Sequence, residues 1–180
     1  LGTLRGLATG GSGVLVMQDA GGVVSVSGDA VFDGGNELDL LSAGGMSVGG
    51  NLTQRATNSG DSFHPSGTHI TVLTGTAPTI GFATPGLVPG TSHFQELAWV
   101  GGGTLTLSTP VMAHGTLTLT SQTTSTFATP NGSRLTVGNV TVVPGTTAPV
   151  ESVTVPVISP KVCAETGKQT ARNARRTAMV

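Results

Sequence analysis

Hydrophobic and hydroxyl-bearing residues alternate in short runs along much of the chain, and a glycine-containing pair ends many of these runs. Residues 25–30 read SVSGDA, and residues 47–52 repeat the phrase as SVGGNL. Residues 136–140 (TVGNV) form a third, shorter copy. Alternation with period two places Val or Leu on one face of a strand and Ser or Thr on the other. Gly-Asp, Gly-Gly and Gly-Asn pairs favour turns, so the pattern predicts short β-strands joined by tight corners.

Two all-β folds accept this pattern. Residues 103–107 and 115–119 both read GTLTL, which adds an internal pair at a closer spacing. Parallel coils would stack their strands about 4.8 Å apart, and a recurrence of about 22 residues suits a coil of two or three short strands. A sandwich core usually contains more aromatic bulk than five Phe, one Trp and no Tyr. We therefore favour a parallel β-solenoid (β-helix) with Gly, Asn and Asp corners, with an antiparallel β-sandwich as the alternative.

Charge divides the chain unevenly. Residues 1–160 hold three basic and eight acidic residues, whereas residues 161–180 hold five basic residues and one acidic residue. The expected organisation is an N-terminal lead-in (1–19), a β-solenoid repeat domain (20–143), an extended linker or first strand of another domain (144–160), and a basic tail (161–180). The tail is expected to be either helical or disordered.

The low charge also bears on function. Only 9% of the residues are charged, compared with roughly 25% in an ordinary domain. Solenoid lyases and hydrolases need several carboxylates together with Arg or Lys in one groove, and the charges of residues 1–160 are too few and too scattered for that. We therefore expect no enzymatic activity and no cofactor. We also expect no nucleic-acid partner, because the basic tail lacks aromatic residues to stack on bases. No apolar run approaches the length that a membrane-spanning helix requires.

One segment suggests a cation site. Asp33, Asn36, Glu37 and Asp39 place side-chain oxygens at close intervals, which is the ligand chemistry that Ca²⁺ prefers. Neither the EF-hand spacing nor a Gly-Gly-x-Gly-x-Asp repeat is present. Turns rich in Asp, Asn and Gly account for the same residues, and we favour that interpretation over a calcium site.

The less regular stretch 55–100 contains the remaining candidate binding residues. His64 and His69 would face opposite sides of a single strand because their spacing is odd. No Cys or Glu lies near them to complete a zinc set, so these two and His93 are expected to have packing or corner roles. Phe94 and Trp99 are the candidates for a glycan-binding aromatic platform, although the apolar neighbours of Trp99 favour a core position.

Three phrases in this region resemble the repeat regions of very large bacterial surface and adhesin-like proteins. They are GGNLTQ at 49–54, SGTH at 66–69 and SHFQEL at 92–97, in that order, and the resemblance covers about residues 20–143. It implies a non-catalytic structural or adhesive module of a secreted or cell-surface bacterial protein. The partners to expect are a glycan, a host or cell surface, or further copies of the chain joined through solenoid ends or edges.

A second resemblance begins at residues 148–155 (APVESVTV), which are similar to the opening strand of bacterial immunoglobulin-like repeats. After Pro160 the chain departs from that family's pattern. Two alternative functions stay open beside the structural one: a self-assembling extracellular filament subunit and a carbohydrate-binding module.

Overall fold

The computed structural model describes residues 2–121 and 125–144. The expected linker from residue 145 onward and the basic tail lie outside the described residues. The strands are β1 (Leu7–Gly10), β2 (Val23–Val26), β3 (Ala30–Asp33), β4 (Gly45–Val48), β5 (Leu52–Gln54), β6 (Ile70–Leu73), β7 (Thr79–Phe82), β8 (Glu96–Trp99), β9 (Gly103–Leu107), β10 (Val111–Ser121), β11 (Ser125–Ala128) and β12 (Leu135–Pro144), with a short 3-10 turn at Pro130–Gly132.

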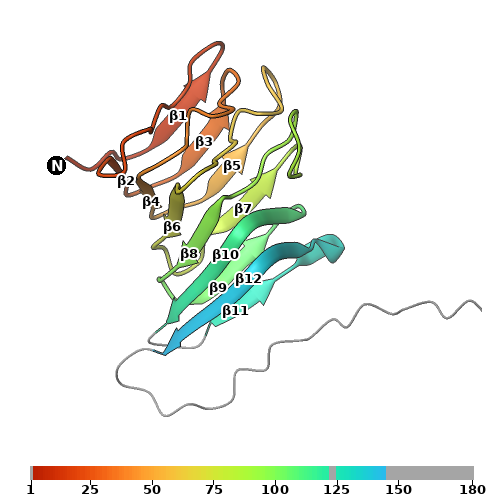
Figure 1. The fold of residues 1–180 in the computed structure, drawn as a ribbon. Coiled ribbons are helices and arrows are strands. Elements are labelled where there is room, and N and C mark those ends of the chain that lie inside the picture. The colour runs from red at the N-terminus through yellow and green to blue at the C-terminus, as the bar shows by residue number, and fades with distance from the viewer. Residues whose placement is uncertain (1, 122–124, 145–180) are drawn as a thin grey trace, which may run out of the picture. The chain divides into compact units, whose positions relative to one another are not determined.

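The strands form two parallel sheets that face each other across a common core. The odd-numbered strands make one six-stranded sheet in the order β1-β3-β5-β7-β9-β11, and the even-numbered strands make the other. Each turn of the chain adds one strand to each sheet, so the described residues form six coils (Figure 1). We number them coil 1 (β1 and β2) to coil 6 (β11 and β12). The parallel β-solenoid prediction is confirmed, and the antiparallel sandwich is not the fold.

Strand register explains why the repeat could be recognised. Ser25 pairs with Ser47 in the next coil, and these residues open the two repeated phrases. Gly45 pairs with Ile70, and Ile70 pairs with Glu96. The sequence separation between paired residues is larger in these later coils, because longer loops precede β6 and β8. The coils also begin before residue 20, since β1 already pairs with β3.

Loops join each odd-numbered strand to the following even-numbered strand, and they stack on one another as the strands do. We call this the loop side; it comprises residues 11–22, 34–44, 55–69 and 83–95 with the start of β10. Backbone bridges link Met17 to Leu41 and Phe94 to Ala113. The loops are therefore paired through their backbones at these points, as the strands are.

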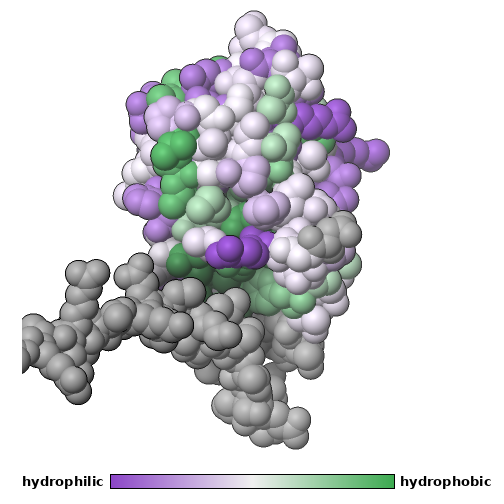
Figure 2. All heavy atoms as spheres, turned by 90° about the vertical axis from the view of Figure 1, so that its right-hand side faces the viewer, coloured by the Kyte–Doolittle hydropathy of each residue, from purple (hydrophilic) through white to green (hydrophobic). Residues whose placement is uncertain are grey.

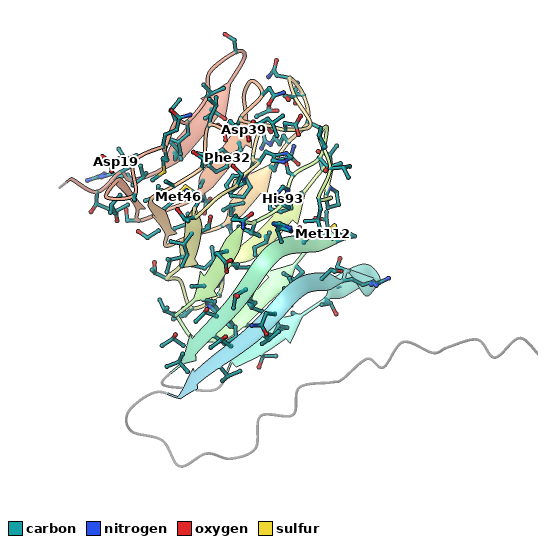
Figure 3. All side chains as sticks on the ribbon, in the orientation of Figure 1. Asp19, Phe32, Asp39, Met46, His93 and Met112 are labelled. Carbon is teal, nitrogen blue, oxygen red and sulfur yellow. The ribbon has the colours of Figure 1, made fainter. Side chains whose placement is uncertain are left out.

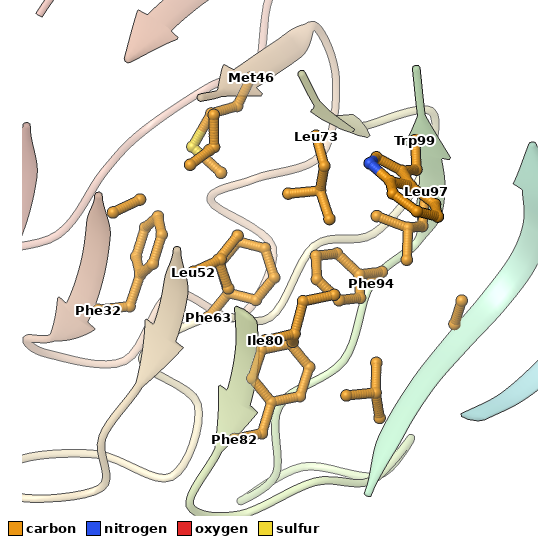
Figure 4. Packing of buried hydrophobic residues seen from close by; sticks show 14 of the residues in the cluster. Phe32, Met46, Leu52, Phe63, Leu73, Ile80, Phe82, Phe94, Leu97 and Trp99 are labelled. Carbon is orange, nitrogen blue, oxygen red and sulfur yellow. The ribbon is translucent and has the colours of Figure 1, made fainter. Parts of the chain in front are cut away.

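Five aromatic side chains fill the middle of the core: Phe32, Phe63, Phe82, Phe94 and Trp99 (Figure 4). The Phe63 ring centre lies 4.7 Å from that of Phe32 and 5.4 Å from that of Phe94. Aliphatic residues from both sheets surround them. Buried apolar area of this kind contributes about 25 cal/mol per Å² to folding.

The corners after the even-numbered strands are tight because each passes directly over the corner below. A Cβ atom at Gly49 would overlap the carbonyl oxygen of Ser27. In the same way, a Cβ at Gly75 would overlap the carbonyl of Gly49, and one at Gly101 the carbonyl of Gly75. Glycine recurs there because no side chain fits between the stacked corners.

The described residues contain no helix that is long and apolar enough to cross a membrane.

Candidate functional site

The loop side carries a pocket of about 420 Å³ that brings together three of the protein's four histidines. Coils 3, 4 and 5 all contribute to its wall, which consists of His64, Ser66, Gly67, Leu87, His93, Gln95 and His114. Figure 3 labels His93 on this side of the molecule. Figure 2 faces the same side and shows narrow hydrophobic strips between paler and hydrophilic residues. The pocket forms because stacked loops bring residues far apart in the sequence to neighbouring positions.

Asp61 and the backbone of the next coil hold His64 in place. Its Nδ1 lies 2.8 Å from Oδ1 of Asp61 and 2.9 Å from the carbonyl oxygen of Thr91. Both partners are acceptors, so we assign the ring proton to Nδ1. That assignment leaves Nε2 as the unprotonated nitrogen of a neutral ring. Asp61 also accepts a hydrogen bond from the Gly90 N–H at 2.8 Å, so the pair links coil 3 to the loop of coil 4.

The His93 ring packs edge-to-face against that of His64, with 4.4 Å between ring centres and 77° between ring planes. The His93 residue is only 5% exposed, and its buried Nδ1 has no hydrogen-bond partner in the described part of the chain. Burial is the largest of the effects that lower the pKa of His93 to about 4, and repulsion from the His64 ring in its protonated form is the second. Backbone groups of Gly86 and Pro65 oppose the fall in pKa, and His114 adds to it. His93 is therefore uncharged at neutral pH.

His114 lies at the open rim of the pocket. It is exposed, and its Nδ1 lies 3.2 Å from Oε1 of Gln95. In the part of the chain that the structure describes, no three His, Cys, Asp or Glu side chains are arranged to hold a metal ion. The imidazole rings that line this pocket can take up protons and form hydrogen bonds.

The four candidate oxygen ligands, Asp33, Asn36, Glu37 and Asp39, differ in burial and in their hydrogen-bond partners. Asp33 accepts a hydrogen bond from a backbone N–H of the next coil, and Asn36 accepts one from the N–H two positions ahead of it, as in an Asx turn. Asp39 is exposed and takes a positive φ of 62°. Glu37 is buried and accepts the Leu15 N–H at 2.8 Å. The Asx turn at Asn36 is the turn chemistry expected for this segment, and Asp33 and Glu37 accept hydrogen bonds from different backbone N–H groups.

Sequence reasoning missed the burial of Glu37. Among the described residues, its second oxygen, Oε2, has no hydrogen-bond partner. Burial raises the pKa of this carboxyl to about 8, and the hydrogen bond from Leu15 opposes the rise only in part. Nothing in the local pattern distinguishes it from the exposed acidic residue Asp39, because burial depends on the coil stacked beside it.

The other candidate binding residues lie inside the fold. His69 is buried, with Nδ1 at 3.0 Å from the carbonyl of Ala43, and does not line the pocket. Phe94 is 0% exposed and Trp99 is 1% exposed. The indole N–H of Trp99 donates to the carbonyl of Gly75 at 3.0 Å. The expectation of a glycan platform at these two aromatic residues is corrected, because a sugar cannot reach their ring faces.

The outermost described coils form a second candidate site. Several residues that pack against the core remain partly exposed, and these lie at the two ends of the coil stack: Leu7, Leu15 and Val24 at one end, and Leu119, Phe127, Leu135 and Val137 at the other. Val140 and Val142 of β12 are each 40% exposed although their partners on β10 face the core. Among the described strands, β1, β2, β11 and β12 pair with a strand on one side only.

Comparison with known proteins finds no family model, no curated protein and no solved structure that matches the chain.

Proposed function

We propose that the β-solenoid is a structural or adhesive module of a secreted or cell-surface bacterial protein and that it has no catalytic activity. The parallel pairing of neighbouring strands through all six described coils is the observation that carries this proposal. Such a stack lengthens by repetition and presents two sheet faces, and its stability comes from contacts between neighbouring coils. A surface in which Ser, Thr, Asn and Gly replace charged residues is consistent with this role.

The geometry of the histidine pocket also supports a non-catalytic role. In a catalytic Ser-His-Asp triad, the Asp orients a His whose Nε2 contacts a nucleophile. Asp61 orients His64 in a similar way, but Asp61 and His64 both also hold the loop of coil 4. Among the described residues, no hydroxyl is hydrogen-bonded to Nε2 of His64. We interpret the pair as a structural link between coils.

Mechanical and enzymatic measurements test the two parts of this proposal. Pulled from its ends in a force experiment, the chain should resist extension and then unfold in a few cooperative steps, because neighbouring coils share one core. Extension without a resisting step would overturn the structural role. Turnover of polysaccharide or ester substrates that is lost in His64→Gln would overturn the absence of catalysis.

Self-assembly into filaments is a second candidate function, supported by the partly exposed core residues at both ends. A coil of a second copy could continue both sheets at an end, in a head-to-tail contact that does not close on itself. Light scattering at increasing protein concentration should then show growth, and Val142→Lys should reduce it. Val88→Lys is the matched control, since Val88 is exposed on a loop away from the strand edges. Strictly monomeric protein at high concentration would exclude this function.

A further inference from the structure

We propose that His64 and His93 form an acid-sensitive clasp, which holds loop 83–92 against coil 3 and releases it when both rings carry a proton. This regulation goes beyond a purely structural role. It rests on the placement of the two rings on neighbouring coils and on the contacts that fix the loop.

The loop is attached to coil 3 by a small set of hydrogen bonds. At its tip, the Gly90 N–H donates to Asp61 and the Thr91 carbonyl accepts from His64. Ser92 Oγ donates to the carbonyl of Gly60 at 2.7 Å. At the other end, Thr84 contacts the same carbonyl and the side chain of Gln54. The two bonds at the tip therefore both depend on the Asp61–His64 pair.

A single proton leaves this arrangement intact. Protonation of Nε2 makes the His64 ring cationic, and the Asp61 carboxylate lies 2.8 Å from its Nδ1. The two side chains then form an ion pair, which strengthens the hydrogen bond between them. The loop keeps both of its contacts at the tip.

A second proton would be carried by His93, and no carboxylate of the described residues is among the groups that act on this ring. The titratable groups that act on the His93 ring are His64 from coil 3 and His114 from coil 5, and both are imidazoles. Asp61 lies beyond His64 and is already paired with it. Two cationic rings with centres 4.4 Å apart repel each other. The buried ring must then move toward water.

Movement of the His93 ring would displace the loop, because His93 directly follows the loop residue Ser92 in the chain. Burial holds the pKa of His93 near 4, so release is expected in the acidic range around that value. The loop carries Leu87 and Val88, which are already 41% and 60% exposed. Its release would widen the pocket and change the surface that the loop side presents.

Hydrogen exchange of the full chain tests the clasp, with rates corrected for the intrinsic effect of pH. In the wild type, the Gly90 amide, which donates to Asp61 of coil 3, should lose protection as the pH falls from about 7 to 4. The loss should approach about tenfold for each pH unit between about 6.5, the ordinary pKa of histidine, and about 4, and it should level off at lower pH. Amides of β6 and β8 should stay protected over the same range. His93→Phe keeps an aromatic ring that cannot take a proton, so this variant should keep the loop protected at pH 4.

His114→Gln is the matched control, because His114 lines the same pocket but is exposed, and its one side-chain hydrogen bond among the described residues is with Gln95. This variant should still open in acid. If His93→Phe does not fold, His93→Gln provides the same comparison. The clasp is excluded if wild-type loop protection is equal at pH 7 and pH 4. It is also excluded if the His93 variants open at the same pH as the wild type, or if β6 and β8 open together with the loop.

Discussion

Glu37 places an ionisable carboxyl where water cannot solvate its charge. Its pKa is about 8 in the fold against an ordinary value of 4.5, so the folded protein holds a proton that the unfolded chain releases at lower pH. The associated stability is fully present below pH 4.5 and is lost as the pH rises through 8. The largest loss is on the order of 5 kcal/mol, since one pKa unit corresponds to about 1.4 kcal/mol.

The Glu37→Gln variant should remove this pH dependence. Gln keeps the shape of the side chain and an oxygen that can accept the Leu15 N–H, but it cannot ionise. Urea unfolding should show the variant to be several kcal/mol more stable than the wild type near pH 9, and within about 1 kcal/mol of it near pH 5. The control is Asp39→Asn, because Asp39 is exposed and Asn tolerates its positive φ. Parallel pH profiles for wild type and Glu37→Gln would contradict the assignment of a buried, protonated carboxyl.

His93 makes folding stability depend on pH in the opposite direction. Its pKa in the fold is about 4 against an ordinary value of 6.5, so the unfolded chain binds a proton that the folded protein rejects. Its contribution to stability is complete above pH 6.5 and is lost as the pH falls through 4, by roughly 3 kcal/mol. Burial also lowers the pKa of His69, so this residue changes stability with pH in the same direction as His93. Together with Glu37, these residues predict a stability maximum between about pH 4.5 and 6.5. Chemical denaturation from pH 3.5 to 9 checks it, and a maximum above pH 8 would contradict it.

At the scale of the elements, the stacked glycine corners determine how closely one coil can lie on the next. Gly75→Ala would place a methyl group against the carbonyl oxygen of Gly49. We expect a loss of about 1–3 kcal/mol, the usual cost of overpacking. Gly10→Ala is the control, because nothing lies within 4 Å of a Cβ at that position, and its effect should stay within about 0.5 kcal/mol. Thermal unfolding compares the two variants, and equal melting temperatures would show that the corners can spread without cost.

The same corners explain which part of the fold could be predicted from the sequence. SVSGDA and SVGGNL repeat because they are the same strand and corner in coils 1 and 2. The two GTLTL segments are instead β9 and the middle of β10, which belong to opposite sheets of one coil. The histidine pocket could not be predicted in this way. His64 and His93 lie on the loops of different coils, and these loops vary in length, so no fixed period aligns the two rings.

At the scale of the whole described solenoid, stability should fall from the central coils toward the ends. Coils 3 and 4 have a neighbour on both sides and contain the Phe63, Phe82 and Phe94 cluster, whereas coils 1 and 6 have a described neighbour on one side only. In a linear stack, each coil is stabilised mainly by the interfaces with its neighbours. Native-state hydrogen exchange should therefore show the slowest amides in β5 to β8 and the fastest in β1 and β11.

Protein concentration then separates an isolated stack from one that continues into a second copy. If copies join end to end, the amides of β1 and β11 should gain protection as concentration rises, because new strands pair with those edges, while β5 to β8 should not change. If the ends remain free, the gradient from centre to ends should be the same at every concentration. Uniform exchange through all six coils would contradict both expectations, because it would mean that the coils open as one cooperative unit and not through their nearest-neighbour interfaces.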